Sequence, residues 1–114
     1  MINVLISEPT RFGTMVQKAE VDTYKDYYKH LKCDMFDAVR VIWDGHEISL
    51  YVDDEGMLKS GNLGRMVEGY PNPLFGTIVI TGGVDAEGET LGVPEDFDIL
   101  KINNFIGEVQ YVVS

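Results

Sequence analysis

The chain has 114 residues, with 19 acidic side chains against 9 Lys and Arg, so its formal net charge is −10 at pH 7. This charge argues against direct binding to nucleic acid or to an anionic membrane, because binding phosphates requires clustered Lys and Arg. It favours a protein partner with a basic surface, although acidity also maintains solubility without any partner. An apolar share of 45% with 11% aromatic residues is typical of a globular chain, and the length is that of one domain over residues 1–114.

The single cysteine and the N-terminal residues indicate in which cellular compartment the protein is expected. The lone Cys33 cannot form a disulfide within the chain, which favours a reducing environment. The N-terminal residues are apolar for only a short run and lack a basic leader, so we expect a first strand there and not a signal peptide. No window approaches the roughly 18 apolar residues that a membrane span requires. We therefore expect a cytoplasmic protein.

Strands dominate the predicted secondary structure. Apolar or alternating β-prone runs, bounded by Gly, Pro and Asp, predict strands over residues 2–7, 14–21, 35–43, 46–52, 74–81 and 105–113. An Asp-Gly pair between the third and fourth of these runs is a strong hairpin signal. Residues 74–81 are the most apolar and β-branched, which predicts a central strand buried on both faces.

Short helices accompany these strands. A first helix is predicted after Thr23, because Asp26 completes a capping box and aromatic residues recur at helical spacing up to Leu31. A second short helix is predicted over residues 62–68, and the loop after Pro94 can open another. Strands outnumber helices, most connections are hairpin-like and no βαβ repeat occurs. The predicted fold class is therefore α+β, a mainly antiparallel sheet with one or two short helices.

Carboxylates gather in two segments. Three consecutive acids closed by Gly56 form a turn, and six more acids lie between residues 85 and 98 with no cation among them. Either segment can present charge to a basic partner, and charges along an extended loop can imitate a row of phosphates. Asp and Gly are also ordinary turn formers, and an acidic loop can simply be solvated. The candidate partner-binding residues are Asp53, Asp54, Glu55, Asp85, Glu87, Glu89, Glu95, Asp96 and Asp98.

No catalytic or metal-binding pattern stands out. The second acidic segment faintly resembles a calcium-binding loop, but Thr90 stands where glycine is required and Asp96 where a bidentate glutamate is required. His30 and Cys33 share a predicted helix face, yet nothing marks an oxyanion hole beside them. Phosphate-binding and hydrolase motifs do not occur. We therefore expect no catalytic residue, no metal site and no cofactor.

The basic residues support a second hypothesis, a pocket at an oligomer interface that sequesters an anionic small molecule such as a nucleotide signal. Its candidate residues are Lys25, Lys29, Arg40, Asn62 and Arg65. The lysines of the predicted helix can equally pair with the protein's own carboxylates. An accessory interaction module is a third hypothesis, and the oligomeric state stays open.

Several segments together carry a family pattern. A first strand, from Val4, is followed by a proline at position 9, and an acidic turn closed by Gly-x-Leu spans Asp53 to Leu58. Asn62 and Arg65 come next, before an apolar strand that both begins and ends in glycine, at positions 76 and 82. Over residues 2–100 the chain resembles the domain of unknown function 3846 family, small acidic proteins of phages and mobile elements. It departs from the family pattern in residues 70–73 and in its last strand.

The resemblance implies a setting and no active site. Small acidic proteins of phages and conjugative elements often counter host defence systems. We therefore expect a non-enzymatic inhibitor whose acidic surface occupies the basic nucleic-acid-binding channel of a host defence complex, of the CRISPR or restriction type, as a DNA mimic.

Overall fold

The computed structural model describes residues 1–43, 45–93 and 99–114. In chain order the elements are β1 (Ile2–Thr10), β2 (Gly13–Val21), α1 (Tyr24–Leu31), β3 (Phe36–Trp43), β4 (His46–Asp53), the 3-10 helix η1 (Gly56–Leu58), β5 (Leu63–Val67), β6 (Leu74–Phe75), β7 (Ile78–Thr81), α2 (Ile99–Phe105) and β8 (Ile106–Val112). The α+β class with mainly antiparallel strands is confirmed. None of the described helices has the length and hydrophobicity required to cross a membrane.

The larger sheet has five strands in the order β2-β1-β7-β4-β3, and all neighbouring strands are antiparallel. The smaller sheet has three strands in the order β6-β5-β8. Within the larger sheet, β7 occupies the centre, and Ile78, Val79 and Ile80 are completely buried. The prediction of a central strand buried on both faces is confirmed for this part of residues 74–81.

The other part of residues 74–81 belongs to a different sheet, which the sequence analysis did not predict. β6 pairs with β5 in the smaller sheet, and the chain then crosses to the larger sheet through Gly76 and Thr77. Gly76 has a φ of 88°, a left-handed value that ends a strand and that glycine adopts without steric cost. One apolar run in the sequence therefore forms two strands in two sheets.

The prediction of a short helix over residues 62–68 is wrong. Residues Leu63–Val67 form β5, the middle strand of the smaller sheet, paired with β6 on one side and β8 on the other. Asn62 does not cap a helix; its side chain holds the preceding turn. Pairing with β8, distant in the sequence, overrides the local helix-start signal.

Local signals give the hairpins and the first helix correctly. The Thr23 hydroxyl accepts a hydrogen bond from the Lys25 amide at 3.3 Å, and the Asp26 carboxylate accepts from the amides of Thr23 and Asp22 at 3.1 and 2.7 Å. These backbone hydrogen bonds lower the pKa of Asp26. The last predicted strand is confirmed as β8, while the segment after Pro94 lies outside the described residues up to residue 98.

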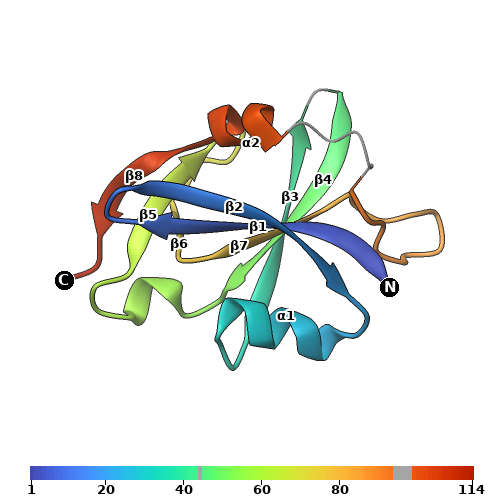
Figure 1. The fold of residues 1–114 in the computed structure, drawn as a ribbon, viewed down its shortest axis with the longest axis horizontal. Helices are drawn as coiled ribbons and strands as arrows, with labels where there is room; N and C mark the ends of the chain where they lie inside the picture. Colours follow the sequence, from blue (N-terminus) through green and yellow to red (C-terminus); the bar gives the residue numbers. More distant parts are fainter. Residues whose placement is uncertain (44, 94–98) are drawn as a thin grey trace.

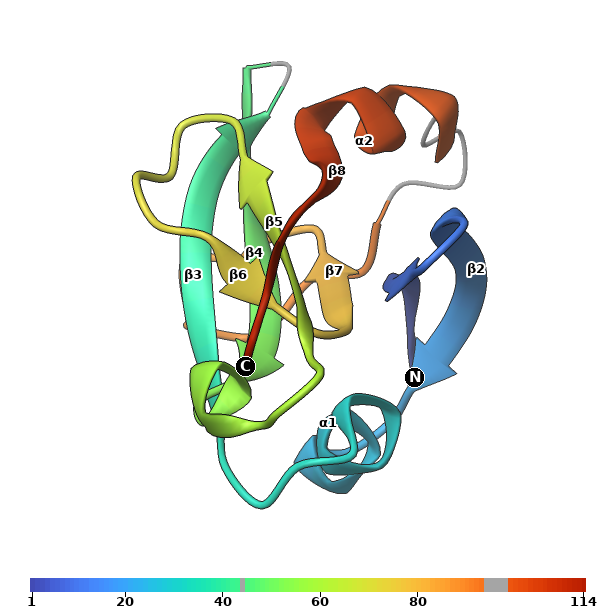
Figure 2. The same ribbon diagram turned by 90° about the vertical axis from the view of Figure 1, so that its left-hand side faces the viewer.

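Two apolar cores lie on the two faces of the larger sheet. On one face α1 covers Val4, Ile6 and Val79 with its buried Tyr27 and Leu31. On the other face, the smaller sheet and α2 cover the side chains of β3, β4 and β7. The two helices lie at opposite ends of the molecule in both views (Figures 1 and 2).

Candidate functional site at the β4–β5 connection

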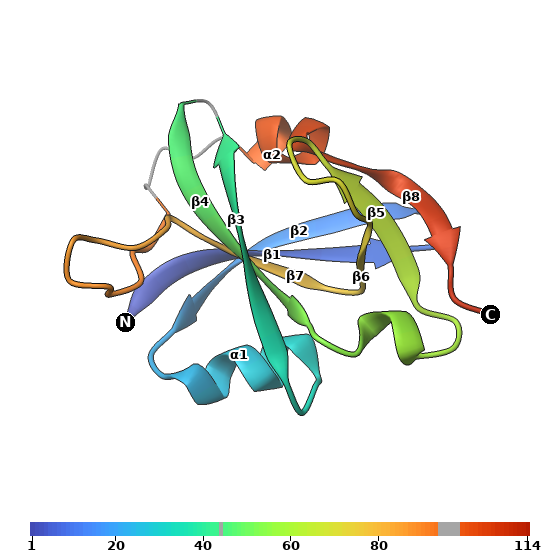
Figure 3. The same ribbon diagram turned by 180° about the vertical axis from the view of Figure 1, so that it is seen from behind.

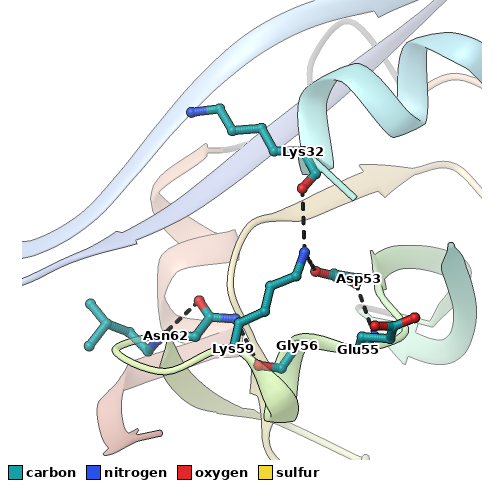
Figure 4. Close-up of polar contacts among 7 residues, drawn as sticks. Lys32, Asp53, Glu55, Gly56, Lys59 and Asn62 are labelled. Carbon is teal, nitrogen blue, oxygen red and sulfur yellow. Dashed lines mark hydrogen bonds and ion pairs between the residues drawn. The ribbon is translucent and has the colours of Figure 1, made fainter. Parts of the chain in front are cut away.

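The acidic turn after β4 is held by its first carboxylate. Asp53 Oδ1 accepts a hydrogen bond from the Glu55 amide at 2.9 Å, and Oδ2 forms an ion pair with Lys59 Nζ (Figure 4). Lys59 Nζ also donates to the Lys32 carbonyl oxygen at 3.4 Å, and its hydrogen bond with Asp53 raises the pKa of Lys59. The Asp53 side chain is only 8% exposed. The charge that this turn presents to solvent therefore comes from Asp54 and Glu55.

The far side of the turn is fixed by Asn62 (Figure 4). Its Nδ2 donates to the Gly56 carbonyl oxygen at 3.0 Å, and its Oδ1 accepts from the Leu63 amide at 3.2 Å. A Cβ atom at Gly56 would lie 2.8 Å from the Phe75 carbonyl oxygen, and one at Gly76 would lie 3.2 Å from the Asn62 amide group. The turn therefore packs directly against the backbone where β6 ends.

Arg65, on β5, is completely buried between the two sheets. Its Nη1 donates to Ser7 Oγ at 2.7 Å and to Thr14 Oγ1 at 3.4 Å, and its Nη2 donates to the carbonyl oxygens of Ser7 and Gly76 at 3.0 and 3.1 Å. Nε has no partner among the described residues. Burial lowers the pKa of Arg65 to about 10, which leaves it cationic at neutral pH.

Three exposed apolar side chains are close to the exposed acids of the turn, two of them along the chain and one across the β3–β4 ladder. Met57 is 66% exposed and Leu58 79%, and both follow Asp54 and Glu55 in the chain. Met35 is 56% exposed and lies beside Asp54, because its carbonyl oxygen accepts a 3.0 Å hydrogen bond from the Asp54 amide. These five residues, Met35, Asp54, Glu55, Met57 and Leu58, form what we call the acidic–apolar patch.

Two grooves flank the turn. One, of about 290 Å³, is lined by Asp37, Asp53, Asp54, Met57, Tyr70 and core side chains of β3, β4 and β6, and we call it the acidic groove. The other, of about 350 Å³, is lined by Lys32, Lys59, Asn62, Thr77 and neighbouring residues, and we call it the lysine groove.

The family model described as Domain of unknown function (DUF3846) matches residues 2–106. The chain belongs to this family. Comparison with curated proteins and with solved structures gave no match.

Segments that carry the DUF3846 pattern converge in space. Pro9, Asp53, Asn62 and Gly76 all line the lysine groove, although they come from four separate segments of the chain. The Gly76 carbonyl oxygen accepts a hydrogen bond from Arg65, another residue of the pattern. In this DUF3846 protein the pattern residues therefore build one junction between the acidic turn, β1 and the smaller sheet.

The second acidic segment is separate from the first. Asp85 Oδ1 accepts hydrogen bonds from the amides of Glu87 and Glu89 at 2.8 and 3.0 Å, so this carboxylate also closes its own turn. The Glu87 and Glu89 side chains are exposed. This loop lies towards the end of the long axis opposite η1 (Figures 1 and 3). The structure thus does not join the two segments into one surface, and the predicted residues Glu95, Asp96 and Asp98 lie outside the described part of the chain.

Within the described residues of a single chain, the basic candidates do not line one groove together. Lys25 and Lys29 are exposed on α1 and Arg40 is exposed on β3, and neither groove of the β4–β5 connection includes them. Arg65 is used inside the protein, which leaves Asn62 as the predicted ligand residue that lines a groove.

The remaining reactive groups add no chemistry to the site. Burial, and secondarily the Asp53 carboxylate, raises the pKa of the Cys33 thiol, the opposite of nucleophile activation. Within the described ranges, no three His, Cys, Asp or Glu side chains converge in a way that holds a metal ion.

Sequence reasoning missed the apolar half of the patch and Lys59, whereas Lys32 belongs to the lysines of the predicted helix that were already considered for an anionic ligand. Met57 and Leu58 follow the acidic turn, where the sequence indicates only a return to apolar chain and not the exposure of these side chains. Lys59 is the next residue in the chain, six positions after Asp53. This spacing predicts no ion pair by itself, because the two side chains meet only through the 3-10 helix η1 that lies between them.

Proposed function

We propose that the protein is a non-enzymatic binding protein that docks the acidic–apolar patch on a basic protein surface. The supporting observation is that three exposed apolar side chains lie next to two exposed carboxylates at the β4–β5 connection, by chain adjacency and by the hydrogen bond between Asp54 and Met35. Methionine side chains adapt to irregular partner surfaces, and an exposed apolar cluster ringed by polar groups is typical of interaction sites. The carboxylates add electrostatic steering towards a basic surface.

The partner in this proposal is the basic nucleic-acid-binding surface of a host defence complex of the CRISPR or restriction type. The protein acts for a phage or mobile element in the host cytoplasm. The net charge of −10 and the kinship with DUF3846 support this setting. We propose one-ended docking and not an imitation of a long row of phosphates, because the described acidic segments lie apart.

Matched variants test the patch. Glu55→Lys with Leu58→Ser changes one charge and one apolar side chain in the patch, and Glu87→Lys with Leu91→Ser makes the same changes in the other acidic loop. Each purified protein is used to capture partners from bacterial lysate at low and high salt, and captured proteins are identified by mass spectrometry. We expect a nucleic-acid-binding protein to be captured by the wild type and the loop variant, and lost with the patch variant or at high salt. Equal loss from both variants, or capture that does not depend on salt, contradicts the proposal.

The lysine groove supports a second candidate function, binding of an anionic nucleotide signal. Lys32 and Lys59 line it together with Asn62 and the hydroxyl-bearing Ser60 and Thr77, and so do the acids Glu8 and Asp53. Because Asp53 pairs with Lys59, Lys32 is the lining cation left to bind an anion. Thermal stabilisation by a panel of cyclic nucleotides, abolished by Lys32→Ala, is the expected result. Absence of stabilisation by every nucleotide in the panel argues against this candidate, and a pure docking protein gives that outcome.

A further inference from the structure

The acidic groove, which adjoins the acidic–apolar patch, has the composition of a receptor for one long cationic side chain. It is lined by residues of β3, β4 and β6. Val39, Val52 and Leu74 are members of the main apolar core and line the groove. Its floor is therefore apolar and already ordered.

Carboxylates lie on the same strand faces as these apolar residues. Successive side chains in a strand point to opposite faces, so Asp37 shares a face with Val39, and Asp54 lies two residues beyond Val52. The hydrogen bond from the Asp54 amide to the Met35 carbonyl oxygen extends the β3–β4 ladder to this position. Floor and rim thus come from the same two strands.

The rim carries uncompensated negative charge. No Lys, Arg or His lines the groove. Asp53 is paired with Lys59, whereas Asp37 and Asp54 have no ion-pair partner among the described residues. Among the residues that the structure describes, Asp37 accepts a hydrogen bond from the neighbouring Ala38 amide alone, through Oδ1 at 2.9 Å, so its other oxygen is open to an incoming donor.

We propose that the acidic groove binds an arginine side chain of the partner protein; this inference rests on the proposed docking function and specifies what the partner supplies. The aliphatic stem of arginine covers apolar surface while its charged head stays at a polar rim, which matches this arrangement of floor and carboxylates. Tyr70 also lines the groove, and guanidinium groups stack on aromatic rings and bind carboxylates in a forked geometry that lysine lacks. Other side chains fit the groove less well. An apolar side chain would remove water from the carboxylates of Asp37 and Asp54 without giving them a hydrogen-bond partner, and an anionic side chain would be repelled by them.

Short peptides test the groove directly. The probe is the blocked peptide Gly-Leu-Arg-Leu-Gly, compared with the same peptide carrying lysine or the neutral arginine isostere citrulline, in NMR titrations of the full chain. We expect the arginine peptide to shift the amide signals of Asp37, Asp54 and Tyr70, the lysine peptide to bind more weakly, and the citrulline peptide to bind at least about tenfold more weakly.

Variants assign the effect to the rim. Asp37→Asn and Asp54→Asn, made singly and together, are expected to weaken arginine-peptide binding, at least about tenfold for the double variant. Glu87→Gln with Glu89→Gln removes two charges from the other acidic loop and is expected to leave binding unchanged. Since each single substitution affects an exposed side chain, thermal melting is expected to stay close to that of the wild type.

The outcomes separate this inference from the docking proposal. If the citrulline peptide binds as well as the arginine peptide, or the double variant keeps full binding, the groove is not an arginine receptor. If the double variant still captures the lysate partner in full, the inference is overturned while docking stands. If the arginine peptide binds in the groove but no partner is captured through the patch, the arginine site stands and the proposed function fails.

Discussion

Arg65 Nη1 lies 2.7 Å from Ser7 Oγ, and this contact joins the smaller sheet to β1 across 58 positions of the chain. The guanidinium is completely buried, and no carboxylate of the described residues pairs with it. A buried charge is costly unless hydrogen bonds satisfy it. Here oxygen atoms of Ser7, Thr14 and Gly76 take that role, so the relative position of the two sheets depends on them.

Ser7→Ala is therefore expected to destabilise the protein by about 1–3 kcal/mol, because it removes the shortest of these hydrogen bonds from a buried cation. Thr14→Ala removes the long 3.4 Å contact and is expected to cost less. Urea unfolding followed by circular dichroism measures both changes. Equal losses for the two variants contradict the assigned role of Ser7.

Gly56→Ala is expected to destabilise the fold by about 1–3 kcal/mol through overpacking. The new Cβ lies 2.8 Å from the Phe75 carbonyl oxygen, a backbone atom that cannot swing away. Gly107→Ala, whose Cβ lies 3.1 Å from the Met66 carbonyl oxygen, is a milder test of the same kind. Thermal unfolding ranks the two, and a larger loss for Gly107→Ala refutes the predicted order.

Asn62→Asp is expected to loosen the acidic turn. The substituted side chain keeps an acceptor for the Leu63 amide but loses the donor that binds the Gly56 carbonyl oxygen. A loss of about 1–2 kcal/mol in the free energy of unfolding is expected. Hydrogen exchange measures whether the amides of residues 56–62 are less protected. Unchanged protection there shows that Asn62 does not hold the turn.

The phenol of Tyr27 makes stability depend on pH in the alkaline range. Burial, with a smaller effect of Tyr51, raises the pKa of Tyr27 to about 12, whereas the unfolded chain has the ordinary value of about 10. Between these values the unfolded state loses its proton first, so the free energy of unfolding falls as pH rises from about 10 to 12. Tyr27→Phe is expected to reduce this slope, and Tyr24→Phe, at an exposed position, is the control. Equal slopes in both variants show that Tyr27 is not responsible.

Features that depend on neighbouring residues were predictable from the sequence. The Thr23–Asp26 capping box and the β1–β2 hairpin need only a few positions of chain, and both are present. The identity of β5 was not predictable, because its strand form depends on pairing with β8 some forty residues away. The change of sheet at Gly76 was not predictable either. The positive φ of Gly76 is indicated in the sequence only by a glycine within an apolar run, and a glycine there does not by itself predict that the strand ends.

The candidate site was predictable in its chemistry and not in its geometry. The acids of the two segments were identified, but the first acid of each segment is used internally, Asp53 for Glu55 and Asp85 for Glu87. An Asp side chain that accepts a hydrogen bond from the amide two residues later forms an Asx turn, which is a common local structure. The internal use of Asp53 and Asp85 is therefore consistent with the sequence. The distance between the two segments depends on the topology of the whole sheet, which no local pattern encodes.

The two junctions of the molecule differ in what holds them. Arg65 is held by hydroxyl and carbonyl oxygens of three separate residues, whereas one carboxylate, that of Asp53, holds the first half of the acidic turn. Removal of the Asp53 carboxylate takes away the ion pair with Lys59 and touches none of the contacts of Arg65. A single substitution at Asp53 is therefore expected to loosen the docking end of the protein while its two sheets remain joined.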